Sequence, residues 1–240
     1  MTSAAERYQG NAYLRHNPSW HSDDSPWKAR QVLKMLERRA CSPTSVCEVG
    51  CGAGVILRTL HDEMDPSLRF VGYDIAPAAI ELAQPLTTER LSYRLADFAT
   101  CRDTYDLLLL IDVIEHVETP VDFLRSIGGR AENYILHIPL DLSAEWVLRP
   151  AALLNERLNV GHLHFFNVQL AAQVLAEGGL EVVDWFYTPW NFAFSRPGSR
   201  LRRAKKRLHE IGFAARPDLY ARLFHGVSMM VFARPACQPE

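Results

Sequence analysis

The sequence predicts an α/β fold in which helices cover both faces of a parallel sheet. Strand-like apolar stretches alternate with helix-like amphipathic stretches from Val46 onward, the order typical of parallel strands joined by crossover helices. A glycine-rich turn, Gly50-Cys-Gly-Ala-Gly54, follows the first strand and opens the first of these helices. The unbroken apolar run at 107–111 predicts a central strand buried on both faces.

Length and composition favour one domain with extra segments. The chain has 240 residues, of which 48% are hydrophobic and 22% charged, and its net charge of −2 gives no global attraction to nucleic acid or anionic membranes. The longest apolar run is far shorter than the roughly 20 residues that span a bilayer. The N-terminus lacks the apolar core of a secretory signal, so we expect a cytoplasmic protein. Five scattered cysteines predict free thiols: Cys41, Cys47, Cys51, Cys101 and Cys237.

The alternation from Val46 onward gives each element an expected range. Strands are expected at 46–49, 70–73, 92–95, 105–111, 134–138, 180–187 and 226–233, and helices at 55–63, 77–84, 120–127 and 168–176. Three pieces fall outside this alternation: an arm before Ala40, a segment at 140–160 and a basic segment at 195–224. In the arm, Ser25-Pro26-Trp27 predicts a helix start with Ser25 as N-cap.

Acidic residues accompany the ends of the first three strands. Glu48 lies two residues before the first glycine of the turn, where a carboxylate suits an ammonium group better than a pyrophosphate. Asp74 ends the second strand, the position at which α/β nucleotide sites bind ribose hydroxyls. Asp97-Phe98 follows the third strand and offers an acceptor for an adenine amino group and a ring to pack on it.

Taken in order, these motifs and Asp112-Val-Ile-Glu-His-Val117 resemble the class I S-adenosylmethionine-dependent methyltransferases. The resemblance covers roughly residues 46 to 187 and is strongest to the branch of the ubiquinone-pathway and tailoring O-methyltransferases. It implies a Rossmann-like, doubly wound sheet of seven strands with the last strand antiparallel, to which the pieces outside the alternation add an N-terminal helical arm and helical insertions. The implied contacts with the cofactor S-adenosylmethionine are Glu48, Gly50, Gly52, Gly54, Asp74, Ile75, Asp97, Phe98 and Asp112.

The same resemblance organises the chain as one methyltransferase domain over residues 1–240. We expect an arm or lid at 1–40, a cofactor-binding half at 41–139, and a substrate-side half at 140–240 that contains the basic insertion 195–224. The transferred methyl group would point toward Glu115 and His116. S-adenosylhomocysteine would be the product.

Two histidines are candidates for the general base that takes the proton of the acceptor. His116 follows the fourth strand and titrates near neutrality, although a packing role fits it as well. Gly161-His-Leu-His-Phe-Phe166 places His162 or His164 at the same rim, since alternate residues of an extended segment share a face. The competing interpretation is that both are structural histidines.

A metal site is the alternative for this region. Asp112, Glu115, His116 and His162 are similar in order to the magnesium-binding set of small-RNA 2′-O-methyltransferases. Mg²⁺ prefers oxygen ligands, however, and Asp112 is already assigned to the cofactor, so we predict no metal.

Two further segments have both a functional and a structural interpretation. The basic run of Arg196, Arg200, Arg202, Arg203, Lys205, Lys206 and Arg207 suits a substrate phosphate, a membrane surface or RNA, or else is a solvated helical face, which we favour. The aromatic side chains Tyr13, Trp20, His21 and Trp27 of the arm suit a lid over the cofactor or acceptor, or else a helix that docks on the core.

The sequence therefore predicts an enzyme that methylates a small molecule, with a hydroxyl of a sugar, glycan or secondary metabolite as acceptor. The alternatives are a metal-assisted RNA ribose 2′-O-methyltransferase, an N-methyltransferase, a non-catalytic cofactor-binding partner and a nucleotide-dependent oxidoreductase. DNA bases are excluded as acceptors because the chain has neither the [N/D]-P-P-[Y/F] motif after the fourth strand nor a Pro-Cys nucleophile. A homodimer is left open.

Overall fold

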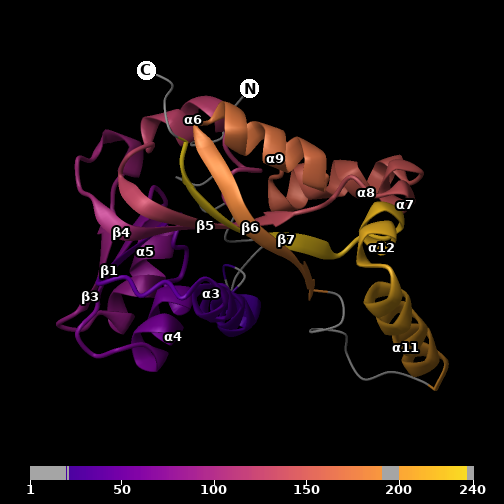
Figure 1. Cartoon of the computed structure of the whole chain (residues 1–240), viewed down its shortest axis with the longest axis horizontal. Helices are drawn as coiled ribbons and strands as arrows, with labels where there is room; N and C mark the ends of the chain where they lie inside the picture. The colour runs from indigo at the N-terminus through magenta and orange to yellow at the C-terminus, as the bar shows by residue number, and fades with distance from the viewer. Residues whose placement is uncertain (1–19, 21, 191–199, 237–240) are drawn as a thin grey trace.

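The computed structural model describes residue 20 and residues 22–190 and 200–236. Within them, seven strands form one sheet in the order β3-β2-β1-β4-β5-β7-β6 (Figure 1). The strands are β1 Ser45–Val49, β2 Arg69–Asp74, β3 Leu91–Leu95, β4 Tyr105–Ile111, β5 Ala131–Pro139, β6 Leu180–Pro189 and β7 Val227–Pro235. β1 to β5 pair in parallel, whereas β7 runs antiparallel to both β5 and β6. The predicted seven-stranded sheet with its antiparallel last strand is confirmed.

Helices cover both faces of this sheet. In Figure 1, α3 and α4 lie below the sheet, and α6 and α9 lie above it. The longer helices are α3 Ser25–Arg39, α4 Val55–Glu63, α5 Pro77–Ala83, α6 Pro120–Ser126, α9 Val168–Glu177, α11 Arg200–Ala215 and α12 Pro217–Leu223. The shorter helical turns are η1 Ser22–Asp24, η2 Gln84–Leu86, η3 Phe98–Thr100, α7 Ala144–Val147, α8 Pro150–Asn155 and η4 Glu156–Val160.

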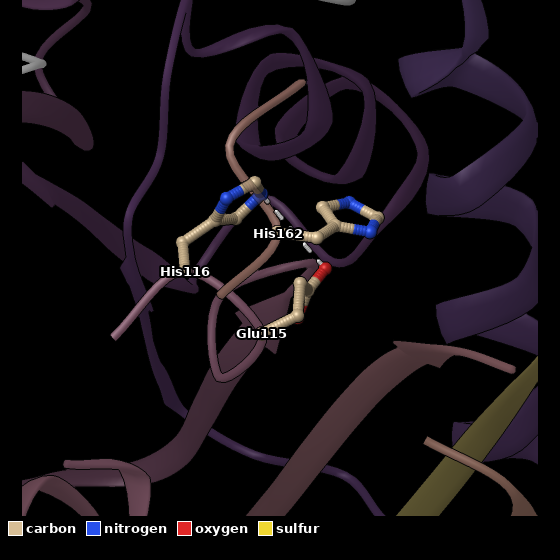
Figure 2. Close-up of side chains that lie close together, drawn as sticks. All are labelled: Glu115, His116 and His162. Atoms are coloured by element: carbon tan, nitrogen blue, oxygen red, sulfur yellow. Dashed lines mark ion pairs between the residues drawn. The ribbon is translucent and has the colours of Figure 1, made fainter. Parts of the chain in front are cut away.

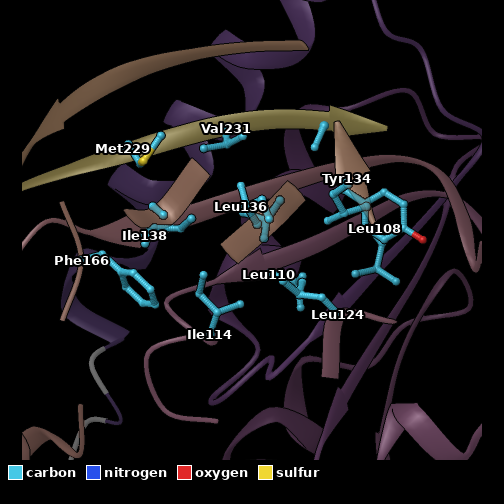
Figure 3. Packing of buried hydrophobic residues seen from close by; sticks show 14 of the residues in the cluster. Leu108, Leu110, Ile114, Leu124, Tyr134, Leu136, Ile138, Phe166, Met229 and Val231 are labelled. Carbon is cyan, nitrogen blue, oxygen red and sulfur yellow. The ribbon is translucent and has the colours of Figure 1, made fainter. Parts of the chain in front are cut away.

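The leucine run of β4 separates two apolar cores. Leu108 and Leu110 belong to the core under α6 and α9, which also contains Leu136 and Val231 of the neighbouring strands (Figure 3). Leu107, Leu109 and Ile111 belong to the core under α3, α4 and α5. Side chains alternate across a strand, so an unbroken apolar run fills both cores. The prediction of a central strand at 107–111 is thereby confirmed.

The N-terminal arm ends in a helix that docks on the sheet. Val32 and Met35 of α3 are fully buried in the core, and Arg38 at its other end forms a two-pronged ion pair with Asp184 of β6 (Nε–Oδ2 2.7 Å). Ser25 is the first helical residue rather than the N-cap, because Asp24 is the flanking residue and no side chain caps the helix. The predicted start was thus one residue late, while Pro26 stands in the first turn as expected.

The extra segments also fold as helices. The segment at 140–160 forms α7, α8 and η4, and the basic segment forms α11 and α12. Four residues singled out in the sequence, Tyr13, His21, Arg196 and Cys237, lie outside the described residues. No helix in the described part of the chain has the length and apolar character needed to cross a membrane.

Candidate active site

A cavity of about 800 Å³ opens at the carboxyl ends of β1, β2 and β4. The chain passes outward from β1 to β2 and β3 and then returns to β4, so the cavity lies at the topological switch point, where α/β sheets bind ligands. The residues predicted as site residues that line it are Glu48, Gly50, Gly52, Asp74, Ile75, Asp97, Phe98, Asp112, His116 and His162. Gly54, Glu115 and His164 are not part of its lining.

The glycine turn is shaped by close packing. Gly50, Gly52 and Gly54 all have positive φ, which side chains disfavour. A Cβ atom on Gly54 would lie 2.6 Å from the ring of Tyr93, whose hydroxyl donates a 2.7 Å hydrogen bond to the Gly54 carbonyl. A Cβ on Gly52 would lie 2.8 Å from Trp20 Cδ1, so the arm covers this turn. Close packing and positive φ together therefore require glycine at these positions of the turn.

Asp74 is held by the backbone of the turn. Its Oδ2 accepts a hydrogen bond from the Gly52 N–H (2.9 Å), and its Oδ1 accepts one from the Ala76 N–H (2.8 Å). Burial raises the pKa of the carboxyl, and these backbone donors oppose the shift. Each oxygen has a second lone pair, so the carboxylate can still accept two ribose hydroxyls.

The end of β3 offers less than the sequence predicted. Asp97 is exposed, and its Oδ1 accepts a hydrogen bond from the Ala99 N–H (3.0 Å), which leaves Oδ2 for a ligand. Phe98 lines the cavity, but its ring is almost entirely buried and packs edge-on against Tyr73 at 5.1 Å between ring centres. Little of its ring face is therefore open to an adenine.

Glu48 is a buried acid with an unused oxygen. The side chain is 1% exposed, and among the described residues Oε2 has no hydrogen-bond partner. Burial, with the nearby charge of Asp74, raises the pKa of Glu48 well above its usual value, although Lys28 opposes the shift. Such an acceptor at the cavity wall fits a ligand ammonium group, because a buried polar atom without a partner is costly.

A buried ion pair joins the arm to the end of β4. Lys28 Nζ lies 2.7 Å from Asp112 Oδ2 and 2.9 Å from Asp24 Oδ2. Burial raises the pKa of Asp112, but Lys28 and His137 outweigh it and hold that pKa well below its usual range. Burial lowers the pKa of Lys28, yet the two carboxylates outweigh it and keep the ammonium charged.

Both oxygens of Asp112 are therefore engaged within the protein. Oδ1 is hydrogen-bonded to Nδ1 of His137, whose Nε2 lies 2.8 Å from the Thr188 hydroxyl. Lys28 and His137 were missed in the sequence. His137 was detectable, since it stands beside Ile111 in the β4–β5 register at a strand end, whereas no motif marks Lys28.

The residues after β4 meet the segment after β5 in a polar cluster that we call the histidine cluster: Glu115, His116 and His162 (Figure 2). His116 Nε2 lies 4.0 Å from Glu115 Oε1, and the two imidazole rings are edge-to-face with centres 4.9 Å apart. The carbonyl oxygen of Glu115 accepts hydrogen bonds from the backbone N–H groups of Leu163 and His164, which brings the two segments together.

The cluster combines a fixed imidazole with an unsatisfied carboxyl. His162 Nδ1 is hydrogen-bonded to Asp141 Oδ2 at 2.7 Å. Burial lowers the pKa of His162, but Asp141, Glu115 and Glu156 outweigh it and raise it to about 9. Both carboxylate oxygens of Glu115 lack a hydrogen-bond partner among the described residues, and burial, then the charge of Asp112, raises its pKa to about 8. Asp141 was not anticipated from the sequence.

The two candidate rim histidines differ in position. His162 lines the cavity, whereas His164 Nε2 lies 3.2 Å from the Glu118 carbonyl and its ring packs beside Phe166. The far wall of the cavity includes Trp146, which stacks on His225 at 5.1 Å between ring centres. Trp146 lies in the insertion 140–160, and nothing in its local sequence marked it as part of a site.

The arm and the basic segment relate differently to the cavity. Trp20, Asp24, Ser25 and Lys28 line it, so the arm both docks on the core and forms part of the cavity wall. By contrast, no described residue of α11 or α12 lines the cavity. The cavity lining therefore gives no support to the idea that the basic segment binds a phosphate of the substrate.

Comparisons with known proteins agree with this arrangement. A family model described as a methyltransferase domain matches residues 20–184. The mitochondrial ubiquinone biosynthesis O-methyltransferase of Schizosaccharomyces pombe is 31% identical over 99 residues, which cover 38% of this chain and 35% of that protein. The match thus spans about a third of the curated relative.

Solved structures show a similar fold at low identity. A chain in the complex of the Haloferax volcanii Trm112 methyltransferase activator with a methyltransferase has a TM-score of 0.67 at 16% identity, over 99% of this chain and 100% of that chain. The magnesium protoporphyrin IX methyltransferase of Synechocystis PCC 6803 with bound S-adenosylhomocysteine has a TM-score of 0.58 at 16% identity, over 88% and 83% of the two chains.

Proposed function

Since the chain belongs to the methyltransferase family and takes its methyl group from S-adenosylmethionine, we propose that its acceptor is a hydroxyl group of a small molecule. The acceptor class we favour is a sugar, a glycan or a secondary metabolite. A cavity of about 800 Å³ lies toward the upper end of the roughly 300–1,000 Å³ typical of ligand pockets, which suits a cofactor together with a small acceptor. The printed name of the S. pombe relative, an O-methyltransferase, supports a hydroxyl.

The cofactor occupies the glycine-turn side of the cavity in this proposal. Glu48 receives the ammonium group, Asp74 the ribose hydroxyls and Asp97 the adenine amino group, while Gly50, Gly52 and Gly54 let the backbone approach the ligand. Ile75 and Phe98 supply apolar contact at the adenine end. Asp112, whose oxygens are bound to Lys28 and His137, acts chiefly by fixing Lys28 at the cavity wall.

The histidine cluster carries the proposal for the reaction. His116 accepts the proton of the acceptor hydroxyl, and the oxygen attacks the sulfonium methyl group in line with the departing sulfur. The O–CH₃ bond forms as the S–CH₃ bond breaks, the electron pair stays on sulfur, and S-adenosylhomocysteine leaves. His162, fixed by Asp141, keeps its proton near neutral pH and stabilises the developing negative charge on the acceptor oxygen.

A methyl-transfer screen tests this function. The protein is incubated with methyl-labelled S-adenosylmethionine and matched sets of hydroxylated, aminated and carboxylated acceptors, with the Asp74→Ala protein as the negative control. We expect label to enter hydroxylated acceptors, with the new O–CH₃ group identified by NMR. A product labelled on nitrogen would replace the proposal with N-methylation.

One observation favours a second candidate function, metal-assisted methylation of an RNA ribose 2′-hydroxyl. The ligand atoms of Glu115, His116 and His162 lie within 4.8 Å of one another, and both oxygens of Glu115 lack partners among the described residues. One carboxylate and two imidazoles would hold a divalent metal ion that orients the acceptor oxygen, although two nitrogen ligands suit Mg²⁺ poorly.

Chelation separates the two candidates. With His116 as base, turnover survives treatment with a chelator. Loss of turnover in the chelator, restored by Mn²⁺ or Mg²⁺, together with transfer to RNA carrying a free 3′-terminal diol, would establish the second candidate instead.

A further inference from the structure

The basic helix α11 presents an apolar face that is exposed in the described part of the structure. Leu208 is 70% exposed and Ile211 is 57% exposed, and Ala204 and Ala215 are exposed on the same helix. At 3.6 residues per turn, these four positions lie on one side of the helix. In a surface helix of a globular protein that side normally faces the core.

The opposite side of α11 makes the contact with the body of the protein. His209 Nδ1 is hydrogen-bonded to the Tyr220 hydroxyl at 2.6 Å, and Phe213 packs edge-to-face on the same ring at 5.6 Å. In Figure 1, α11 projects beyond the sheet at one end of the molecule and adjoins α12. The attachment to α12 thus leaves the Leu208–Ile211 side facing away from the fold.

Cations accompany this apolar side. Residues 200–223 contain eight lysines and arginines against two acids, although the whole chain has a net charge of −2. The two acids are already engaged: Glu210 Oε1 lies 3.7 Å from Lys206 Nζ, and Asp218 accepts a hydrogen bond from the Tyr187 hydroxyl. Arg203 and Arg207 are exposed on the same helix as Leu208.

We propose that α11 docks on the surface of a membrane that contains anionic lipids. A helix with leucine and isoleucine on one side and arginine and lysine beside them buries the apolar side among lipid chains and places the cations at phosphate groups. Nucleic acid would use the cations but would gain little from Leu208 and Ile211. A second copy of the chain, paired through the same side, would bring two arginine-rich helices together and is disfavoured by like-charge repulsion.

The position of α11 relates this docking to the cavity. α12 follows α11 and contacts α7, and the chain then continues through His225, Gly226 and Val227, which line the cavity. Trp146 of α7 stacks on His225 at that wall. A membrane at α11 therefore lies at the end of the molecule that carries the acceptor side of the cavity.

Vesicle flotation tests the proposal. The whole protein is mixed with vesicles of equimolar phosphatidylglycerol and phosphatidylcholine, or of phosphatidylcholine alone. We expect flotation with the anionic vesicles that weakens in high salt, and none with the neutral ones. Leu208→Ser with Ile211→Ser should weaken binding about tenfold, and Arg203→Glu with Arg207→Glu by at least fivefold for each cation removed.

Matched variants provide the controls. Leu82→Ser with Leu170→Ser changes two other exposed leucines (43% and 46%), on α5 and α9, and Arg69→Glu with Arg102→Glu makes the same change of charge elsewhere. Both should float like the wild type. Circular dichroism and S-adenosylhomocysteine affinity confirm that each variant is folded.

Three results would overturn the proposal. The first is equal flotation with neutral and anionic vesicles, and the second is unchanged binding by the Leu208/Ile211 variant. The third is a dimer in ultracentrifugation that the Leu208/Ile211 variant converts to a monomer, which would assign this side to a second copy.

Discussion

Asp74, in the half of the cavity that we propose for the cofactor, at the ends of β1, β2 and β3, accepts backbone hydrogen bonds from Gly52 and Ala76. Glu115, in the half formed by the segments after β4 and β5, which we propose for the acceptor, has no hydrogen-bond partner for either carboxylate oxygen among the described residues. The first carboxylate is positioned by backbone N–H groups of the glycine turn and of its own strand end. The second is buried by the fold and accepts no hydrogen bond from these residues, and its nearest ion-pair partner among them is the His116 imidazole, with Nε2 4.0 Å from Oε1.

The buried groups of the acceptor half also have shifted pKa values. In the acceptor half, the pKa of Glu115 is raised to about 8, close to neutral pH, whereas that of His162 is raised to about 9, so its imidazole stays protonated at neutral pH. Groups of this kind gather where protons move. We infer that the half with fixed hydrogen bonds binds the cofactor, and that the half with titratable groups transfers the proton of the acceptor.

The largest loss of stability and of cofactor binding is expected when a side chain is added in the glycine turn of the cofactor half. Gly54→Ala places a Cβ 2.6 Å from the Tyr93 ring at a positive φ, and the buried ring is held by its own hydrogen bond. The variant should lose about 2–5 kcal/mol of unfolding free energy in urea, together with S-adenosylhomocysteine binding. Gly129→Ala, with a similar φ and open space around its Cβ, should lose about 1–2 kcal/mol. Equal losses in the two variants would refute close packing as the cause.

The next effect concerns the titratable half. The pKa of His162 is raised above the value of 6.5 in the unfolded chain, so the stabilisation is full below pH 6.5 and is lost as pH rises through about 9. The unfolding free energy should fall by up to about 3 kcal/mol across this interval. The raised pKa of Glu115 acts in the same direction between pH 4.5 and 8.

His162→Gln provides the control for this pH dependence. It removes the titrating imidazole and should flatten the decline between pH 6.5 and 9 in urea titrations at a series of pH values. A decline as steep in the variant as in the wild type would show that another group is responsible.

The smallest effect distinguishes two acids within the cofactor half. Asp74→Ala removes a buried carboxylate at the ribose position and should weaken S-adenosylhomocysteine binding by about 1.5–3 kcal/mol in calorimetry. Asp97→Ala removes an exposed one and should cost about 0.5–1.5 kcal/mol. If Asp97→Ala weakened binding more, the adenine end rather than the ribose would dominate recognition.

The same two halves differ in how far the sequence predicts them. The glycine turn, Glu48 and Asp74 belong to consecutive strand, turn and helix segments, so the local sequence pattern alone predicts where they lie and which roles to propose for them. The acceptor half depends on contacts between distant residues, such as Lys28 with Asp112 and Asp141 with His162. Such pairs cannot be predicted from a local sequence pattern, because their members are far apart in the chain.

Two other differences between sequence and structure have similar causes. The ring of Phe98 was predicted to pack on adenine, yet most of it is buried against Tyr73 and Tyr105, so only a small part is left at the cavity wall for that contact. The basic segment was interpreted as a solvated helical face. The sequence does not show whether the apolar residues of α11 face the fold or the solvent. The contact with α12 settles this, because it attaches the opposite side of the helix.

The division of labour between the two halves is tested most directly by His116→Asn. With an acceptor from the screen, we expect turnover to fall by about 10²- to 10⁴-fold, since the base is lost, while the affinity for S-adenosylhomocysteine stays within about twofold of wild type. Turnover that is unchanged, or that falls in proportion to cofactor affinity, would contradict the assignment of the chemistry to the acceptor half.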